Sequence, residues 1–361
     1  MYIYKSIPIE NLFYMISYVL ELPFQATLNG NKSDIDRSLG ELYILLFSIE
    51  LSKLIKAGLI KSYHDEENEL LTVRGKINLS RTIDLRCKGK HTIDCIYDEY
   101  SADEYLNRII KSVASQLIFS NISIEPIELK RSLRQNISIM SNIAQIPLKN
   151  ISWETITFNQ YNKRYKTIIL LCELIVESLL LISENESNNF KAIEEKLFHK
   201  LFERFIRSFF RKTYFRKTYF ETNVSDLKMK WNPNKTYEFI PKMHTDTTIT
   251  YLNKTLIIDT KFYKEIFGNN RNSKKFRSGH LYQIFSYVVN YKIQHSNQKV
   301  AGLLLYAATK LSLEKYRFPY NYSLGDVPIS IDIIDLSVEP PEIEEQLNQI
   351  YNRYFIENFI I

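Results

Sequence analysis

Two stretches decide the fold of this chain: Pro241-Lys242-Met243-His244-Thr245-Asp246 and Leu256-Ile257-Ile258-Asp259-Thr260-Lys261-Phe262-Tyr263. An apolar run separates them, and the pattern predicts two short strands joined at Leu252-Asn253-Lys254. Because side chains alternate along a strand, Asp259 and Lys261 share one face. If Asn253-Lys254 forms the turn, Asp246 lies opposite Lys261 and diagonal to Asp259. The local pattern therefore predicts two carboxylates and a lysine at one place.

This trio suits the chemistry of phosphodiester hydrolysis. Two carboxylates hold Mg²⁺ while leaving room for water and a phosphate oxygen, and the ion polarises the phosphodiester. A nearby lysine orients the attacking water or stabilises the charge that develops in the transition state. The tripeptide Asp259-Thr260-Lys261 alone is more often a solvated ion pair on a strand edge. Here it follows Leu256-Ile257-Ile258, which we expect to be buried, and a buried charge is costly unless it is paired or liganded.

With Asp246 as its first half, the trio resembles the signature of PD-(D/E)XK nucleases. Pro241-x-Met243-x-Thr245-Asp246, residues 258–264 and His280-Leu281-Tyr282-Gln283-Ile284-Phe285-Ser286-Tyr287 together resemble McrC, the nuclease subunit of the McrBC modification-dependent restriction system for 5-methylcytosine. Residues 7–15, 74–83 and 101–112 resemble the same family. The resemblance implies that Asp246 and Asp259 hold Mg²⁺, that Lys261 acts in catalysis, and that Gln283 points at the active site.

Composition describes an ordinary globular protein of 361 residues, 45% hydrophobic and 24% charged, long enough for two domains. The net charge of +6 is compatible with a polyanionic partner without identifying one. Three cysteines without a CxxC pair, and an N-terminus unlike a signal peptide, favour the cytoplasm. The most apolar run, 168–182, is too short and too charged for a membrane span. No G-x-x-x-x-G-K-[ST] motif is present, so any GTP would be bound by a partner.

We expect an α/β (α+β) protein in which the polar run 184–189 separates two domains. Residues 1–185 form a helical N-terminal domain, with a β-rich projecting hairpin region near 60–96 and a hairpin turn at Cys87-Lys88-Gly89-Lys90. The resemblance implies that this domain projects into the ring of a partner GTPase, a McrB-like AAA+ protein. A lysine-rich hairpin is usually only solvated, but the resemblance nominates five cations as partner contacts: Arg74, Lys76, Arg81, Lys88 and Lys90.

Residues 190–361 form the expected PD-(D/E)XK restriction-endonuclease-like core, in the order α-β-β-β-α-β. Glu203 interrupts the apolar face of its first helix, and either supports the metal or pairs with Arg207 four residues on. The polar side of that helix and the basic loop 268–277 suit phosphate contacts that are blind to sequence. The nominated DNA-binding residues are Arg207, Arg211, Lys212, Lys274 and Lys275.

Together these features predict a Mg²⁺-dependent DNA endonuclease subunit of a GTP-driven restriction complex that defends against phage, binds double-stranded DNA and stimulates its GTPase partner. Recognition of modified cytosine is expected in the partner, since nothing here resembles a base-flipping pocket. Two alternatives remain: a stand-alone PD-(D/E)XK nuclease of DNA repair, and a non-catalytic adaptor that regulates the GTPase.

Overall fold

The structure is a computed structural model that describes residues 7–23, 39–119, 127–183, 190–218, 221–231, 238–262, 266–270, 273–308 and 317–357. Its contacts divide the chain into two compact units, which we call the sheet unit (Met1–Leu39 with Asn188–Ile361) and the arm unit (Gly40–Ser187). Among the helices that the structure describes, none is long and apolar enough to cross a membrane.

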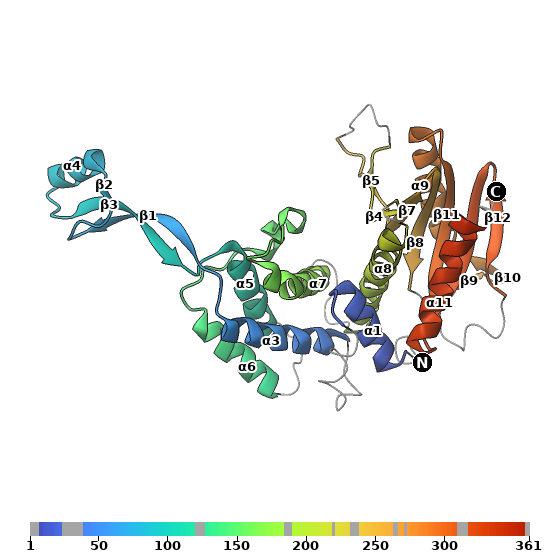
Figure 1. The fold of residues 1–361 in the computed structure, drawn as a ribbon, viewed down its shortest axis with the longest axis horizontal. Coiled ribbons are helices and arrows are strands. Elements are labelled where there is room, and N and C mark those ends of the chain that lie inside the picture. The colour runs from blue at the N-terminus through green and yellow to red at the C-terminus, as the bar shows by residue number, and fades with distance from the viewer. Residues whose placement is uncertain are drawn as a thin grey trace. The chain divides into compact units, whose positions relative to one another are not determined.

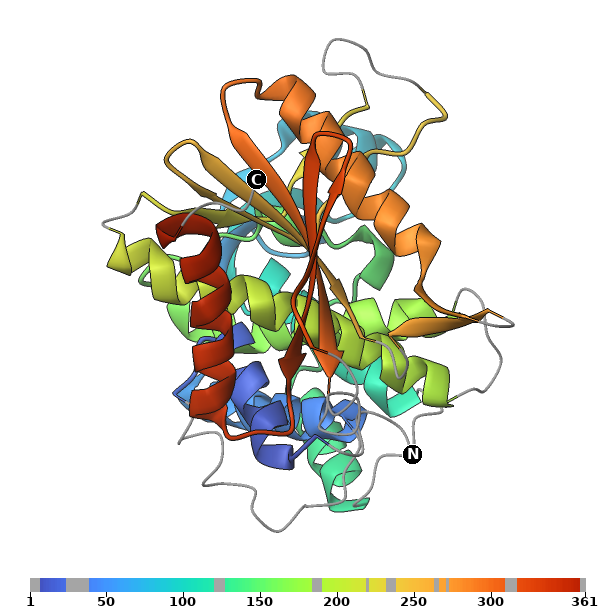
Figure 2. The same ribbon diagram turned by 90° about the vertical axis from the view of Figure 1, so that its right-hand side faces the viewer.

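The sheet unit is organised around a six-stranded mixed sheet in the order β12-β13-β11-β8-β7-β4 (Figures 1 and 2). The central pairs, β8 with β11 and β11 with β13, are parallel, whereas the outer pairs are antiparallel. Parallel neighbours need a crossover, and a helix connects β8 to β11. The strands are β4 (Asn223–Ser225), β7 (Thr247–Tyr251), β8 (Lys254–Lys261), β11 (Lys299–Ala308), β12 (Tyr320–Leu324) and β13 (Val327–Asp335).

Helices cover both faces of this sheet (Figure 2). α8 (Phe190–Lys217) packs on β4, β7 and β8, while α9 (Ser278–Gln294) packs on the opposite face against β8, β11 and β13. α11 (Pro340–Tyr351) lies on the same face as α8: Tyr351 stacks on Tyr214 of α8 with ring centroids 3.5 Å apart. A π-helical turn, Asn352–Ile356, follows α11. The predicted order α-β-β-β-α-β is present as α8, β4, β7, β8, α9 and β11.

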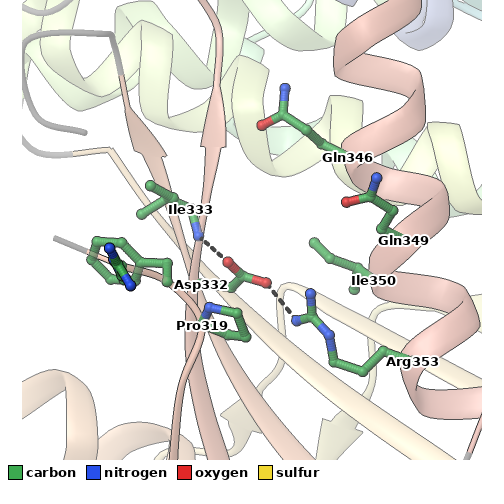
Figure 3. Close-up of a pocket in the computed structure, with 9 residues that line it drawn as sticks. Pro319, Asp332, Ile333, Gln346, Gln349, Ile350 and Arg353 are labelled. Atoms are coloured by element: carbon green, nitrogen blue, oxygen red, sulfur yellow. Dashed lines mark hydrogen bonds and ion pairs between the residues drawn. The ribbon is translucent and has the colours of Figure 1, made fainter. Parts of the chain in front are cut away.

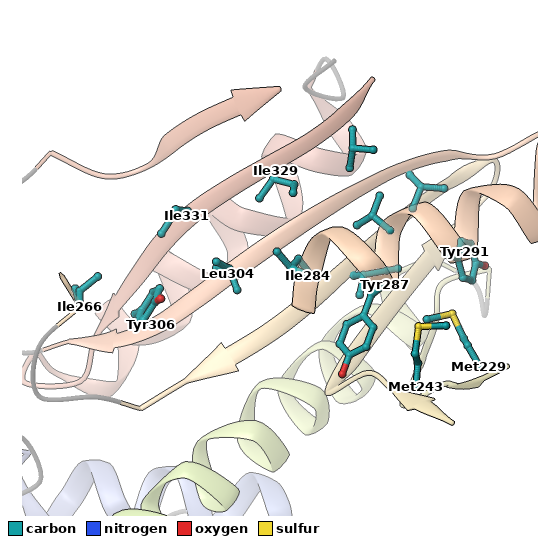
Figure 4. Packing of buried hydrophobic residues seen from close by; sticks show 14 residues of the cluster. Met229, Met243, Ile266, Ile284, Tyr287, Tyr291, Leu304, Tyr306, Ile329 and Ile331 are labelled. Carbon is teal, nitrogen blue, oxygen red and sulfur yellow. The ribbon is translucent and has the colours of Figure 1, made fainter. Parts of the chain in front are cut away.

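The core beneath α9 explains why that helix lies so close to the sheet (Figure 4). Leu304, Ile329 and Ile331 project from the central strands against Ile284 and the rest of the α9 face. Gly302 on β11 permits this approach, because a Cβ there would lie 2.8 Å from Ile284 Cγ1 and 2.9 Å from Val288 Cγ2. The spacing between α9 and β11 therefore depends on a residue without a side chain.

The first helix, α1 (Ile9–Val19), belongs to the sheet unit although it lies at the other end of the sequence. The Asn11 side chain donates hydrogen bonds of 2.7 Å to the carbonyls of Leu336 and Val338. Tyr14 packs edge-on against Phe205 of α8. The expected domain 1–185 thus differs from the compact units at its N-terminal end, while the expected boundary near 185–190 coincides with theirs.

The arm unit combines four helices with a β-ribbon that extends from them (Figure 1). β3 lies between β1 and β2 and is antiparallel to both. The ribbon is fastened at its base, because Asn107 donates to the carbonyls of Ile60 and Ala102, and the Tyr165 hydroxyl bonds both Asn107 and Ile60. The elements are α3 (Leu39–Ala57), β1 (Ser62–Leu70), β2 (Lys76–Ile77), α4 (Leu79–Cys87), β3 (Ile93–Ser101), α5 (Tyr105–Phe119), α6 (Ile127–Ile139) and α7 (Lys166–Ser183).

Three local expectations are wrong. The segment before Lys88 is helix α4, capped by the Asn78 side chain, so residues 87–90 end a helix and do not form a hairpin turn. The basic stretch 268–277, expected as a loop, contains a hairpin of β9 (Phe267–Asn270) and β10 (Ser273–Phe276). The register of the central hairpin also differs, with consequences for the candidate active site.

Candidate active site

The hairpin of β7 and β8 turns at Leu252-Asn253, one residue earlier than expected. Thr247 pairs with Ile258 and Tyr251 with Lys254, so continuing this register by one residue sets Asp246 opposite Asp259, not opposite Lys261. The turn position differs from the prediction because Leu252 adopts a φ of +53°. Leucine seldom takes this conformation, so the sequence does not indicate a turn there. Because the register moves by two residues, the face of each side chain is unchanged.

Asp259 is a fully buried carboxylate whose charge is poorly compensated. Its side chain is 0% exposed, and neither carboxylate oxygen has a hydrogen-bond partner among the described residues. Lys261 Nζ lies 2.7 Å from its Oδ2, within ion-pair distance, but without hydrogen-bond geometry. Burial, and then the charge of Asp246, raise the pKa of Asp259 to about 7 despite the opposing effect of Lys261. This carboxylate is held where an additional positive charge would stabilise it.

Lys261 is oriented by α9. Its Nζ donates to Gln283 Oε1 at 3.0 Å, and Gln283 Nε2 donates in turn to the Tyr287 hydroxyl at 2.9 Å. The positions i and i+4 place Gln283 and Tyr287 on one face of the helix, above the end of β8. The structure thus brings together Asp259, Lys261 and Gln283, three of the residues predicted from the sequence.

Asp246, which precedes β7, reaches across to the end of β8. Its Oδ2 accepts from the backbone N–H of Thr260 at 2.8 Å and from the Thr260 hydroxyl at 2.7 Å. These bonds hold one carboxylate oxygen in place beside Asp259, and the proximity of the two charges contributes to the raised pKa of Asp259. Asp246 is therefore positioned by the strand that carries the other two members of the trio.

The two carboxylates fit a hard divalent cation that keeps much of its water. The orphaned oxygens of Asp259 are the donor atoms that Mg²⁺ prefers, and Asp246 is the second carboxylate beside them. Within the part of the chain that the structure describes, no group of three or more His, Cys, Asp or Glu side chains could hold a metal. A cation here would therefore take its remaining ligands from water or substrate, as Mg²⁺ commonly does.

Glu203, on α8, is buried and engaged with two cations of its own helix. Lys200 Nζ lies 3.1 Å from both of its oxygens, and Arg207 Nη2 lies 2.6 Å from Oε1. Of the two roles weighed for Glu203, pairing with Arg207 is present. Its charge still acts on the centre, because it contributes to the raised pKa of Asp259.

The nominated DNA contacts differ in exposure. Arg211, Lys212 and Lys275 are exposed, and Lys212 Nζ lies 4.7 Å from the ring centroid of Tyr18. Arg207 is largely buried between Glu203 and Asp226. The side chain of Lys274 lies outside the described residues.

Two histidines near the centre received no role in the sequence analysis. His280, in the first turn of α9, bonds the Tyr306 hydroxyl through Nδ1 at 2.8 Å, and burial, with Lys261 next, lowers its pKa to about 4. His199 on α8 has a pKa lowered by burial, against the opposing charges of Asp246 and Glu203. His280 lies three residues before Gln283, a spacing that could have placed it on the same helical face. Nothing local in the sequence singles out His199.

Comparisons with known proteins identify the family of this chain. Residues 6–307 match the family described as McrBC 5-methylcytosine restriction system component. This chain belongs to that family. It is 26% identical to the type IV methyl-directed restriction enzyme EcoKMcrBC of Escherichia coli K12, over 96% of this chain and 98% of the relative. Its fold is similar to a chain in a half-complex from a tetradecameric assembly of Thermococcus gammatolerans McrB AAA+ hexamers with bound McrC, with a TM-score of 0.51, 16% identity, and coverage of 95% of this chain and 75% of that one.

In this McrBC component, the cations nominated for partner binding divide into two groups. Arg74 lies 3.9 Å from the ring centroid of Tyr97, Arg81 lies 3.3 Å from Glu67, and Lys90 lies 2.8 Å from Glu69. All five cations are exposed, and these three also contact side chains of their own ribbon. Their role in partner binding remains a prediction.

A second polar site of this family member lies on the opposite face of the sheet (Figure 3). It is a cavity of about 460 Å³ centred on Asp332 of β13, whose Oδ2 lies 2.6 Å from Arg353 Nη1 and whose Oδ1 accepts from the Ile333 N–H at 2.9 Å. Asp332 is buried, as Asp259 is, but both of its oxygens are bonded. The full lining is Arg317, Phe318, Pro319, Asp332, Ile333, Gln346, Gln349, Ile350 and Arg353.

Proposed function

We propose that this chain is the Mg²⁺-dependent DNA endonuclease subunit of a GTP-driven, modification-dependent restriction complex, and that it also stimulates the GTPase of that complex. The observation that carries the proposal is Asp259: a wholly buried carboxylate with orphaned oxygens, 2.7 Å from a lysine and beside a second carboxylate. Burying a carboxylate whose charge one lysine compensates only in part is costly, and groups with such raised pKa values gather at functional sites. Membership of the McrBC family supports the assignment to restriction.

Asp246 and Asp259 would hold Mg²⁺, which when bound supplies the positive charge that polarises a phosphodiester. Lys261, held by Gln283, carries its ammonium to the same place and stabilises the negative charge that develops on the phosphate. Tyr287 fixes the amide of Gln283, so the lysine is oriented before substrate arrives. The lowered pKa of His280 leaves its ring neutral at pH 7, beside the lysine, without adding a competing positive charge.

The partner in this proposal is a McrB-like AAA+ GTPase ring, which binds the GTP and reads the modified base in double-stranded DNA. The similar structure is described as McrB AAA+ hexamers with bound McrC, and this supports such a partner. The exposed Lys76 and Lys88 on the arm unit are candidates for contacts with it. Arg211, Lys212 and Lys275 are candidates for contacts with DNA phosphates.

Two rivals make different predictions. A stand-alone repair nuclease would cut without nucleotide or partner, and a gene neighbour encoding a G-x-x-x-x-G-K-[ST] GTPase would argue against it. A non-catalytic adaptor would leave no reason for placing Asp246 beside the buried Asp259 and Lys261.

The deciding experiment measures plasmid cleavage by the full chain with its partner, GTP and Mg²⁺, on methylated and unmethylated DNA. Asp259→Ala should lower cleavage of methylated DNA at least about 100-fold, since one electrostatic contact in such a centre contributes about 10²–10³-fold. Glu342→Ala, an exposed change on α11, is the matched control and should cleave normally. Undiminished cleavage by Asp259→Ala would exclude this centre, and cleavage without GTP would favour the stand-alone nuclease.

A further inference from the structure

A chain of polar contacts connects α8 to the segment that carries Asp246. Arg207 Nη1 lies 2.8 Å from Asp226 Oδ2, and Nη2 lies 2.6 Å from Glu203 Oε1. The Arg207 side chain is only 15% exposed, so its guanidinium is enclosed between the two carboxylates. A guanidinium presents its donors in a rigid planar fork, and two of them are already directed at protein oxygens.

Asp226 and Asp246 lie at the two ends of a segment that we call the strap, which is described at residues 226–231 and 238–246. The next residue, Leu227, exchanges two hydrogen bonds with Thr245: its N–H donates to Thr245 Oγ1 at 2.9 Å, and its carbonyl accepts from the Thr245 N–H at 3.0 Å. The strands that follow and precede these residues, β5 (Lys228–Met229) and β6 (Met243–His244), pair with each other. Asp246 therefore immediately follows a backbone that is fixed to the Asp226 segment.

The Asp226 carboxylate stays ionised at neutral pH. Burial acts to raise the pKa of Asp226, but Arg207, the residue's own backbone N–H and His244 outweigh it, and the net pKa lies below the usual value. His244 Nε2 lies 3.3 Å from the same Oδ2 that Arg207 contacts. An arginine that bridges two carboxylates, with one guanidinium nitrogen on each, holds the segments that carry them in a defined relation.

We infer that Arg207 and Asp226 are positioning residues for Asp246, and that Arg207 does not serve as a contact to DNA phosphate. They set the place of the segment 243–246 relative to α8, and through it the carboxylate of Asp246 relative to Asp259. This inference rests on the proposed function in that Asp246 holds the cation. The basic residues on α8 therefore have different roles. Arg207 bonds to carboxylates within the protein, whereas Arg211, one turn later, is exposed to solvent.

The test separates metal binding from DNA binding in the full chain. Isothermal titration calorimetry with Mn²⁺ measures metal affinity, and DNA affinity is measured with the partner present and Ca²⁺ in place of Mg²⁺, over a range of salt. Loss of a residue that supports a metal ligand typically weakens metal binding 10–100-fold. We expect Arg207→Gln and Asp226→Asn each to weaken Mn²⁺ binding about 10-fold, with DNA affinity within about twofold of wild type. Arg207→Lys, which keeps the charge but loses the fork, should lie between.

Two controls make the result specific. Arg211→Gln should show the reverse pattern, with unchanged Mn²⁺ affinity, weaker DNA binding and a shallower dependence on salt. Tyr214→Phe removes a hydrogen bond of 2.6 Å to Asn348 in the same unit, and should lower the melting temperature without changing Mn²⁺ affinity. Asp226→Asn is the more conservative of the two strap variants, because its side chain is partly exposed, and it covers the case in which Arg207→Gln does not fold.

The positioning role of Arg207 and Asp226 is excluded if both variants bind Mn²⁺ as tightly as wild type. Arg207 is a DNA contact if Arg207→Gln instead weakens DNA binding and reduces its dependence on salt. Failure of the proposed function has a different signature: wild type would bind no Mn²⁺, and Asp259→Ala would cleave normally.

Discussion

Among the buried aspartates of the sheet unit, Asp259 on β8 and Asp332 on β13 lie on opposite faces of the same sheet and differ in how their charge is compensated. Asp259 pairs across the strands with Leu304, which pairs with Ile331, and Asp332 follows Ile331 on β13. Because side chains alternate, Asp259 faces α9 and Asp332 faces α11. Asp332 has both oxygens bonded, to Arg353 and to a backbone N–H, whereas both oxygens of Asp259 lack hydrogen bonds.

Under the proposed function, this difference distinguishes a carboxylate that stabilises the fold from one that holds a cation. Burial is nearly equal, at 0% exposure for Asp259 and 7% for Asp332, so burial alone does not distinguish them. What differs is compensation: the fold supplies Asp332 with a cation in hydrogen-bond geometry, and leaves Asp259 with a pKa near 7. A site that keeps a carboxylate under-compensated is prepared for a ligand that the protein itself lacks.

The largest contrast is expected in catalysis. Asp259→Asn preserves the shape of the side chain and removes its charge, so cleavage of methylated DNA should fall about 10²–10³-fold. Asp332→Asn makes the same chemical change on the opposite face and should leave cleavage within about threefold of wild type. Both rates come from plasmid cleavage under single-turnover conditions with saturating partner. Equal losses in the two variants would mean that the comparison reports stability and not catalysis.

For the stability of the fold, the large loss is expected at the Asp332 site and not at Asp259. Arg353→Gln strips Asp332 of its cation, and leaving one partner of a buried ion pair uncompensated costs about 3 kcal/mol. For a unit of this size the melting temperature should fall by about 6–12 °C in thermal denaturation. The double variant Asp332→Asn/Arg353→Gln should recover much of that loss, because it leaves no charge unpaired. If the double variant is as unstable as Arg353→Gln, the loss comes from packing and not from the orphaned carboxylate.

The sequence does not predict which cation pairs with each buried aspartate. The strand ending in Asp259-Thr260-Lys261 and the helix carrying Gln283 are predictable, because apolar runs and helical spacing are local signals. Nearly all of the linker expected at 183–189 lies outside the described residues. Arg353 and Asp332 are 21 residues apart, and Arg207 meets Asp226 across a turn of the chain, so neither pairing follows from periodicity.

The missed elements have similar causes. The turn at Leu252 depends on a positive φ that no glycine marks, and α1 packs on α8 from nearly two hundred residues away. Edge strand β12 is short and mostly exposed, so the alternation of Tyr320, Tyr322 and Leu324 with polar residues spans only five residues. Family resemblance supplied the roles of Gln283 and Glu203, but only the structure shows that Glu203 is bonded to Arg207 and Lys200.

A further effect, on the pH dependence of stability, follows from the pKa of Asp259. The folded-state pKa is raised from 3.8 to about 7, so the protonated form contributes stability that is fully present below about pH 4 and is lost as pH rises through 7. Asp259→Asn does not titrate, and should therefore melt about 8–16 °C above wild type at pH 8, an advantage of about 4 kcal/mol that shrinks towards pH 5. Adding Mg²⁺ at pH 8 should raise the melting temperature of wild type and not of the variant. A constant difference between pH 5 and pH 8 would contradict the raised pKa.

The smallest predicted effects on cleavage concern the orientation of the Lys261 ammonium beside Asp259. Arg353 donates one hydrogen bond of 2.6 Å from a rigid guanidinium to Asp332, whereas Lys261 is a flexible chain whose Nζ donates to Gln283 Oε1. Gln283→Leu removes that acceptor, and a hydrogen bond to a charged group contributes about 1.5–3 kcal/mol, so cleavage should fall about 10–150-fold. Tyr287→Phe acts one bond further away and should cost about 2–3-fold.

Tyr282→Phe, on the exposed side of α9, is the control for changes to that helix and should cleave normally. The order Gln283→Leu below Tyr287→Phe below Tyr282→Phe, measured as single-turnover rates at saturating Mg²⁺, tests whether orientation passes from α9 through the amide to the lysine. If Tyr287→Phe costs as much as Gln283→Leu, the tyrosine hydroxyl contacts the substrate directly and the amide is not the element that orients Lys261.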